Sequence, residues 1–429
     1  MTLEKPKIPN ARLHDGKFPA TYTKAGARHQ VDVSIGPSDS ALNDAFGRLR
    51  VAEPFTIFDS KMLNDASPLF WDDQGVSGGG TSSTHNANQA SVTLAVSAAT
   101  AGRRVRQTRR RFNYQPGKSL TVIMTGVLGA GTAGITRRVG LFDDQNGIFY
   151  RLSGTTLQLV RRTFVTGVAI DNTVDQSAWN IDKLDGAGPS GVTIDTTKTQ
   201  IFFMDVEWLG VGRVRCGVYV DGLPIYVHQF VHANILTTVY MSTPNLPLRY
   251  EIQNDGTGAA ASLTQICSTV LSEGGQDDTG FLRETDTGVT ALAAAAIGTE
   301  YAMLGFRLKS THQAISVNMI GQSILCGSPN DKFLWRWKLN PTVAGTFTYA
   351  DITDSALQRA IGVAANGVTN GIAIAGGYGL SAAVVQSNLS SQLLIGSSIA
   401  GISDTLVLCV TPVTANASMY GACQWRELV

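Results

Sequence analysis

The stretch of sequence that decides the fold class runs from Thr199 to Gln229 and reads TQIFFMDVEWLGVGRVRCGVYVDGLPIYVHQ. Apolar side chains occupy every second position in two runs, which are Phe202, Met204, Val206 and Trp208, then Val214, Cys216, Val218 and Val220. This period of two residues, with polar residues between, is typical of antiparallel strands that have one buried and one solvated face. We expect Gly210-Val-Gly212 and Asp221-Gly222 to form turns. The first turn would place Glu207 opposite Arg215 as a cross-strand ion pair.

Similar strand patterns occupy the chain on both sides of this stretch. Residues 139–152 contain two apolar runs around Asn146-Gly147, a combination that predicts a β-hairpin. Residues 333–339 alternate aromatic with basic side chains, again with a period of two. We therefore predict a mainly β protein, with an antiparallel β-sandwich over 90–275 and a second, C-terminal β domain over 276–429.

Three segments depart from the strand pattern. Residues 1–70 are polar and interrupted by prolines, which predicts an extended N-terminal arm. Residues 71–89 are rich in Gly, Ser, Thr and Asn, and we expect a flexible linker there. Ser355 and Gln358 have the spacing of a capping box, which predicts a short helix that ends at Gly362.

Charge is scarce and unevenly distributed. The 429 residues include 34 Lys+Arg and 33 Asp+Glu, so the formal net charge is +1 and the charged fraction is 16%, against about 25% in typical chains. This balance argues against a disordered chain and makes nucleic acid an unlikely partner. No charged residue occurs between positions 360 and 403. Because exposed surfaces normally carry charge, we expect this tract to be buried, with another copy of the chain as its cover.

Targeting signals and cysteine motifs are missing from the sequence. Residues 1–10 lack the apolar core of a secretory signal, and no run of 18 apolar residues would span a membrane. The five cysteines have no close pair, which argues against disulfides and zinc. We expect a protein that is made in a reducing cytoplasm.

The densest group of like charges is a block of six arginines within nine positions. Its members are Arg103, Arg104, Arg106, Arg109, Arg110 and Arg111. We interpret the block as a solvated strand or a contact between subunits, and a phosphate contact is the alternative. Three other motifs are better explained as turns or structural residues, namely Gly129–Gly134, His228–His232 and Asp143–Asn146. We expect no catalytic, cofactor-binding or metal-binding residues, and no enzyme activity.

The N-terminal arm carries a distinctive pair of motifs, DAFGRLRV at 44–51 and PFTIFDSK at 54–61. They resemble the arm of a family of tailed-bacteriophage virion proteins. The resemblance continues through FNYQPGK at 112–118, WNIDKLDG at 179–186 and SEGGQ at 272–276 and covers roughly residues 40–280. It implies a structural or fibre-like virion component, located in the virion, whose β-sandwich is similar to concanavalin-like lectin domains. It implies no catalytic residues and no cofactor.

From this resemblance we expect the arm to dock the protein on other virion proteins. The candidate docking residues are Phe46, Arg48, Arg50, Phe55, Phe58 and Asp59. The chain is expected to form a homo-oligomer, and a trimer is favoured by analogy with fibres. Three alternatives stay open: a lectin-like module that binds a host surface glycan, a tailspike enzyme that degrades a polysaccharide, and a protein that decorates the capsid.

Overall fold

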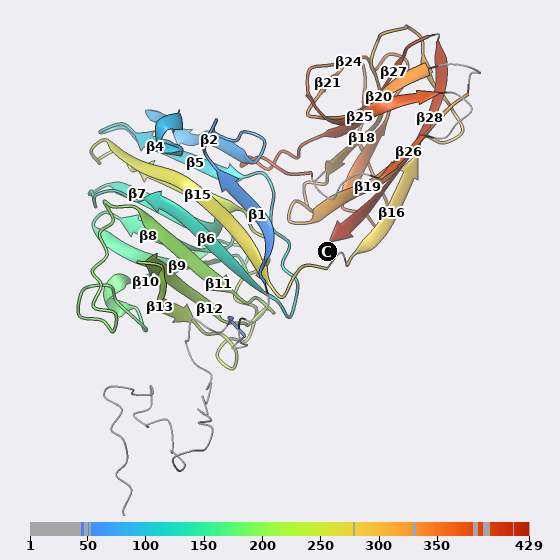
Figure 1. The fold of residues 1–429 in the computed structure, drawn as a ribbon. Helices are drawn as coiled ribbons and strands as arrows, with labels where there is room; N and C mark the ends of the chain where they lie inside the picture. Colours follow the sequence, from blue (N-terminus) through green and yellow to red (C-terminus); the bar gives the residue numbers. More distant parts are fainter. Residues whose placement is uncertain are drawn as a thin grey trace, which may run out of the picture.

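The computed structural model describes residues 44–46, 50, 53–277, 279–327, 332–380, 395–414 and 416–428, and the backbone of 385–388. These residues form two β-sandwiches, a larger one over 55–273 and a smaller one over 281–428 (Figure 1). The described part contains no α-helix, only two single 3-10 turns at Ala87–Gln89 and Gln176–Ala178. The predicted mainly β class is confirmed.

The first sandwich packs an eight-stranded sheet on a seven-stranded sheet, and every strand pairing is antiparallel. The larger sheet consists of β1 (Phe55–Lys61), β3 (Thr81–Asn86), β4 (Ser91–Val96), β6 (Ser119–Val127), β11 (Gln200–Val206), β12 (Val214–Val220), β13 (Leu223–Phe230) and β15 (Ala261–Glu273). The smaller sheet consists of β2 (Trp71–Gly78), β5 (Gly102–Thr108), β7 (Ile135–Phe142), β8 (Gly147–Ser153), β9 (Thr156–Thr163), β10 (Ile170–Asp175) and β14 (Leu248–Asn254). Its strands lie in the order β10-β9-β8-β7-β14-β5-β2.

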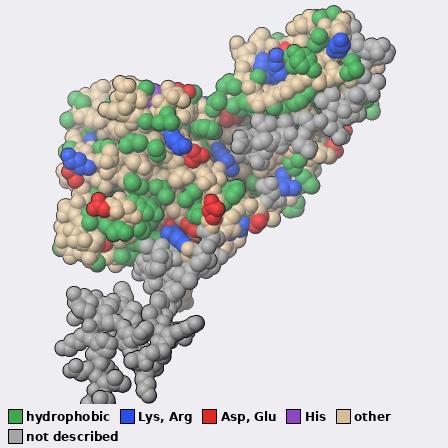
Figure 2. Space-filling view, in the orientation of Figure 1, with side chains coloured by type: hydrophobic (Ala, Val, Ile, Leu, Met, Phe, Trp, Pro, Cys, Tyr) green, Lys and Arg blue, Asp and Glu red, His purple; other side chains and the backbone are tan. Residues whose placement is uncertain are grey.

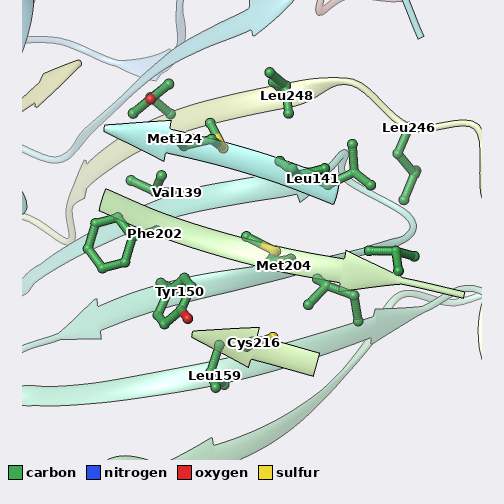
Figure 3. Packing of buried hydrophobic residues seen from close by; sticks show 14 of the residues in the cluster. Met124, Val139, Leu141, Tyr150, Leu159, Phe202, Met204, Cys216, Leu246 and Leu248 are labelled. Carbon is green, nitrogen blue, oxygen red and sulfur yellow. The ribbon is translucent and has the colours of Figure 1, made fainter. Parts of the chain in front are cut away.

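The core of this sandwich lies between the two sheets and uses the alternation seen in the sequence (Figure 3). Phe202 and Met204 of β11 are fully buried, and so are Cys216 of β12 and Tyr150 of β8. The Tyr150 hydroxyl donates to the Gly217 carbonyl at 2.7 Å and so joins the two sheets through the core. Burial of one such large apolar side chain contributes about 1.5–3 kcal/mol.

The register between β11 and β12 differs by two residues from the expected one. Asp205, not Glu207, lies opposite Arg215. The reason is that the turn lies one residue earlier than expected: the Gly212 amide donates to the Trp208 carbonyl at 2.7 Å and the Glu207 amide donates to the Arg213 carbonyl at 3.0 Å. A shift of two positions leaves each side chain on its expected face of the sheet.

The second sandwich packs a five-stranded sheet on a six-stranded sheet, with a small two-stranded ribbon beside them. The five-stranded sheet consists of β16 (Phe281–Asp286), β17 (Leu292–Ala294), β19 (Ser316–Cys326), β26 (Val385–Asn388) and β28 (Ala417–Leu428). The six-stranded sheet consists of β18 (Tyr301–Leu308), β20 (Lys332–Leu339), β22 (Ala350–Asp351), β23 (Leu357–Ile361), β25 (Ile372–Leu380) and β27 (Leu406–Pro412). The ribbon pairs β21 (Thr342–Val343) with β24 (Val368–Thr369).

The predicted helix at 355–362 is wrong, because β23 occupies this segment and pairs with β18. Ser355 does not cap a helix: its hydroxyl donates to Glu427 and accepts the Leu357 amide at 3.0 Å. A serine that bonds to the backbone two residues on favours a turn as readily as a helix start. The predicted alternation at 333–339 is confirmed, since Phe333, Trp335 and Trp337 all lie in the core of this sandwich.

The linker expected over 71–89 contains β2 and β3 instead. Both are edge strands, one in each sheet of the first sandwich. An edge strand has fewer neighbours to cover it, so a sequence of small polar residues serves where a central strand needs apolar ones. The expected arm also ends earlier than residue 70, because β1 at Phe55–Lys61 pairs with β15 along most of its length.

Candidate binding surfaces

The predicted docking residues of the arm lie largely on the first sandwich itself. The Phe58 ring is buried, with its centroid 5.2 Å from that of Phe112 and 6.2 Å from that of Trp71. Phe55 and Asp59 of the same strand are exposed, and Phe46 is partly buried. Arg48 lies outside the described residues.

Arg50 contacts the most elaborate buried polar cluster of the first sandwich. Its Nη2 lies 2.7 Å from the carboxylate of Asp205, which is fully buried. The same carboxylate accepts hydrogen bonds from Arg215 at 2.9 Å, Thr121 at 3.0 Å and the Tyr226 hydroxyl at 2.5 Å. Burial and the Asp205 charge raise the pKa of Tyr226, so its hydroxyl stays protonated and donates. The sequence showed Asp205 only as one polar residue of a strand, because the segment that covers it is distant in the chain.

A second contact fixes the arm next to this cluster, at the start of β12. The guanidinium of Arg213 donates from Nε and Nη2 to the Ala45 carbonyl at 3.1 and 2.9 Å. Together with Arg50 and β1, this contact makes the described part of the arm motif a component of the sandwich. Arg50 and Phe58 thus have intramolecular contacts, and the docking role expected for the arm stays a prediction.

The arginine block of β5 and the following loop also finds its partners within the chain. Five of its six guanidiniums lie within 4 Å of a carboxylate, in the pairs Arg103–Asp144, Arg103–Glu251, Arg104–Asp73, Arg106–Asp73, Arg109–Asp404 and Arg111–Asp143. The sixth, Arg110, donates to the Ile57 carbonyl at 3.2 Å, and burial lowers its pKa to about 10. These arginines, which we expected on a solvated strand or at a contact between subunits, thus have intrachain partners.

Arg109 joins the two sandwiches. Its Nη1 donates to the Asp404 carboxylate at 2.9 Å, and its carbonyl accepts the Ser397 amide at 2.8 Å. Beside it, the Ile399 amide of the second sandwich donates to Asp72 at 2.7 Å. The block therefore contributes to a contact between domains of one chain.

A second group of arginines lies on the outer face of the seven-stranded sheet, away from the core. We call this surface the arginine face and define it by Arg103, Arg138, Arg151, Arg162, Arg249, Glu251 and Asp171. The buried Glu251 accepts from Arg103 at 2.8 Å and also contacts Arg138 and Arg249. Burial alone would raise the pKa of Glu251, but Arg138 and Arg103 outweigh it and hold the pKa below its usual value.

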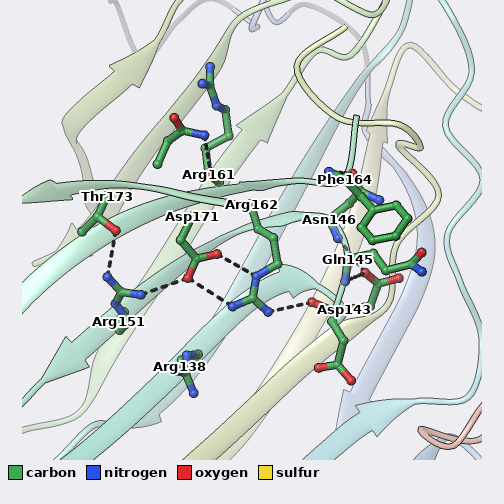
Figure 4. Close-up of polar contacts among 12 residues, drawn as sticks. Arg138, Asp143, Gln145, Asn146, Arg151, Arg161, Arg162, Phe164, Asp171 and Thr173 are labelled. Atoms are coloured by element: carbon green, nitrogen blue, oxygen red, sulfur yellow. Dashed lines mark hydrogen bonds and ion pairs between the residues drawn. The ribbon is translucent and has the colours of Figure 1, made fainter. Parts of the chain in front are cut away.

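The other end of the arginine face is organised by Asp171 (Figure 4). Its carboxylate accepts from Arg162 at 2.8 Å and from Arg151 at 3.0 Å. The guanidinium of Arg162 lies 5.1 Å from the centroid of the buried Phe149 ring. Ion pairs on one side and a cation–π contact on the other hold these guanidiniums in fixed positions.

The histidine and aspartate motifs have structural roles, as we expected. His228 accepts the Asn180 amide at 3.2 Å, and His232 stacks on Tyr240 with ring centroids 4.0 Å apart. Burial lowers the pKa of both histidines to about 4. Asp143 accepts the Asn146 amide at 2.8 Å and so closes the β7–β8 turn. In the described part of the chain, no three His, Cys, Asp or Glu side chains are grouped to hold a metal ion, and no helix would span a membrane.

The second sandwich has an unusual edge. Exposed apolar side chains occur on both sandwiches (Figure 2), and several lie on edge strands, among them Ile170 of β10, Phe281 and Leu282 of β16, and those of β25. β25 reads IAIAGGYGL, and Ile372, Tyr378 and Leu380 are 46%, 76% and 50% exposed. β25 belongs to the tract without charge that we expected to be buried. In the isolated chain, however, every residue of β25 is exposed or partly exposed.

Comparison with known proteins yields matches at the level of fold only. No family model and no curated protein matches the chain. A β-glucanase from Bacillus licheniformis is 13% identical, with 52% of this chain and 98% of that one covered and a TM-score of 0.32. A legume lectin-like domain from Entamoeba histolytica is 8% identical, with 51% and 98% covered and a TM-score of 0.30. The Emp47p carbohydrate recognition domain is 11% identical, with 51% and 97% covered and a TM-score of 0.31. None of these likenesses assigns a ligand or an activity to this chain.

Proposed function

We propose that this chain is a structural component of a bacteriophage virion and acts by assembling with further copies of itself. One observation carries the assembly part: β25 is a nine-residue edge strand without a charged residue or a proline. An edge strand presents unpaired backbone N–H and C=O groups, and monomeric proteins protect such edges with charge, proline or short length.

Two other edges of the second sandwich have protection that β25 lacks, and the remaining edge strand, β26, is uncharged but only four residues long. β16, with the sequence FLRETD, carries Arg283, Glu284 and Asp286. β22, at the opposite edge of the sheet that contains β25, is only two residues long. An unprotected edge beside two protected ones is what a sandwich needs if one edge is covered in the assembly.

A neighbouring copy of the same chain is the occupant that we assign to this edge. Because residues 360–403 contain no charge, a copy that presents the same tract brings no like charge against it. Backbone pairing would supply affinity, and outward side chains such as Tyr378 and Leu380 would be buried between copies. The resemblance to fibre-like virion proteins favours three copies.

The proposed place in a virion rests on the arm motifs at 44–51 and 54–61. Since Arg50 and Phe58 hold the motif on the sandwich, we assign attachment to the residues before Asp44. Deletion of residues 1–43 should leave a folded protein that no longer joins particles. A truncated protein that is still incorporated would contradict the proposed attachment.

Assembly is tested by light scattering on the purified chain and two variants. Tyr378→Lys places a charge on the β25 edge, and Val289→Lys, at a position that is 96% exposed, is the matched control. We expect an oligomer for the wild type and Val289→Lys, and a shift to monomer for Tyr378→Lys with an unchanged melting temperature. A wild-type monomer at micromolar concentration, or an equal response of both variants, would contradict the proposal.

A further inference from the structure

Two arginines of the arginine face lie directly opposite each other on neighbouring strands. Arg138 of β7 is the register partner of Arg151 of β8. Like charges in this position destabilise a sheet by an amount similar to the roughly 0.2–1 kcal/mol that opposite charges contribute. The Arg138–Arg151 pair therefore lowers the stability of the sheet.

The carboxylates that neutralise this pair lie on its two far sides. Arg138 is bonded to Glu251 of β14, whereas Arg151 is bonded to Asp171 of β10. The strand order β10-β9-β8-β7-β14 puts these acids on opposite sides of the arginine pair. Among the described residues, no carboxylate forms an ion pair with both guanidiniums. In Figure 4, Arg138 lies beside the Arg151–Asp171–Arg162 network with no bond to it.

Arg138 also retains donor groups that the protein does not use. Its Nη1 donates to Glu251 and, at 3.3 Å, to Gln253, whereas its Nη2 donates to none of the described residues; the Nε also has no partner, but it is buried. Burial lowers the pKa of this guanidinium, Glu251 and the more distant Asp171 offset that effect only in part, and the neighbouring cations Arg162 and Arg103 lower it further. An added negative charge at this point would therefore be stabilised.

We propose that Arg138 and Arg151 form a clamp for the anionic group of an acidic glycan. Both side chains are fixed by their ion pairs and remain 14% and 16% exposed, so an incoming oxyanion reaches them without a rearrangement. The planar guanidinium matches a carboxylate, sulfate or phosphate by paired hydrogen bonds. Acidic glycan binding adds an activity to the proposed assembly role and does not depend on it.

The surroundings of the clamp favour a sugar over a nucleic acid. Gln158, Thr173 and Gln253 flank the two arginines and already bond to them through amide or hydroxyl oxygens. Such groups suit the hydroxyls of a sugar ring. A nucleic acid needs a continuous positive track, whereas Glu251 and Asp171 on the two sides of the arginine pair interrupt the positive charge of this face.

Binding of defined polymers to the full chain tests the clamp. The probes are polygalacturonate for carboxylate, dextran sulfate for sulfate, polyphosphate and single-stranded DNA for phosphate, and neutral dextran as the blank. We expect polygalacturonate or dextran sulfate to bind, with neutral dextran silent. Binding to neutral dextran with equal affinity, to none of the polymers, or to polyphosphate and DNA alone would overturn the proposal.

Three substitutions of the clamp separate a specific site from general charge. Arg138→Gln and Arg151→Gln should each weaken binding about tenfold or more, since each removes one charge-assisted contact. Arg138→Lys keeps the charge but loses the planar fork and should also weaken binding. Arg336→Gln is the matched control, because Arg336 is 42% exposed on the second sandwich.

Folding and assembly are controlled in the same experiment. Arg138→Gln leaves Glu251 paired with Arg103 and Arg249 and removes the like-charge contact, so its melting temperature should stay close to the wild-type value. An equal loss of binding in Arg336→Gln and the clamp variants would overturn the clamp. An oligomer that binds no acidic polymer would refute the clamp and leave the assembly proposal intact.

Discussion

The guanidinium of Arg50 lies 2.7 Å from the carboxylate of Asp205, at the bottom of a polar cluster on the eight-stranded sheet. The first residue belongs to the arm motif, and the second lies on β11 opposite Arg215. This contact explains why the motif contains arginine at position 50: its guanidinium supplies a further cation for the buried Asp205 carboxylate. We therefore interpret the motif at 44–51 as a latch that holds the arm on the sandwich.

Substitution of Asp205 and substitution of Arg50 should each destabilise the first sandwich, but by different amounts. Asp205→Ala leaves Arg215 buried without its carboxylate and should cost about 3–5 kcal/mol of unfolding free energy. Arg50→Gln should cost less, about 1–3 kcal/mol, because Arg215 and Tyr226 still bond to Asp205. Urea unfolding measures both, and Asp59→Asn, an exposed change on β1, serves as the control.

Proteolysis separates the latch from a general loss of stability. In Arg50→Gln, cleavage before Glu53 should become faster under conditions where the sandwich stays folded. If Arg50→Gln and Asp59→Asn are cleaved at the same rate, the interpretation of the motif as a latch is wrong.

Acid should weaken the first sandwich through its buried histidines. Burial lowers the pKa of His228 and His232 to about 4, whereas an unfolded histidine has a pKa of about 6.5. The neutral form is thus favoured in the folded state, so the stabilisation is complete above pH 6.5 and is lost as the pH falls toward 4. Urea midpoints measured from pH 7.5 to 4.5 should fall.

The pH range in which stability is lost distinguishes the histidines from the carboxylates. Burial alone would raise the pKa of Asp144, but the charges of Arg249 and Arg103 lower it to about 2. Its stabilisation is therefore lost only below about pH 4. The variant with His228→Asn and His232→Asn should show a flatter profile between pH 6.5 and 4.5, and an unchanged slope would refute the assignment.

The contact between the sandwiches should depend on Asp404. This carboxylate accepts from Arg109 at 2.9 Å and from Asn340 at 2.8 Å. Asp404→Ala should therefore loosen the two sandwiches, which small-angle scattering would show as a larger radius of gyration. Asp351→Ala, at a carboxylate that is 66% exposed, should leave the radius unchanged. Equal radii for wild type and Asp404→Ala would show that other contacts fix the domains.

The sequence predicted the fold class well where strands are central and less well at the edges. The alternation at 202–208 and 333–339 reports burial directly, and both sets lie in the cores. β3, with the sequence TSSTHN, has no such pattern because an edge strand buries little on either face. Ser355 shows a different limit: a hydroxyl three residues before Gln358 suits a helix cap, yet its tertiary partner Glu427 selects a turn.

The candidate sites were harder to predict, for a reason that differs between them. Asp205 meets Arg50 only through the tertiary path of the arm. Arg138 and Arg151, however, belong to the hairpin that the sequence predicted around Asn146-Gly147. A two-residue turn at Asn146-Gly147 would place Phe142 opposite Arg151, whereas the observed connection of residues 143–146 places Arg138 there. The sequence predicted the hairpin, but not the register that pairs the two arginines.

Hydrogen exchange at β25 tests the central claim, assembly through this edge, most directly. In an isolated chain, the amides of β25 that do not bond to β20 exchange with solvent, whereas pairing with a neighbouring copy protects them. We predict slow exchange of these amides in the wild-type oligomer and fast exchange in Tyr378→Lys, with β20 equally protected in both. Fast exchange of the same amides in the wild type at high protein concentration would contradict the account.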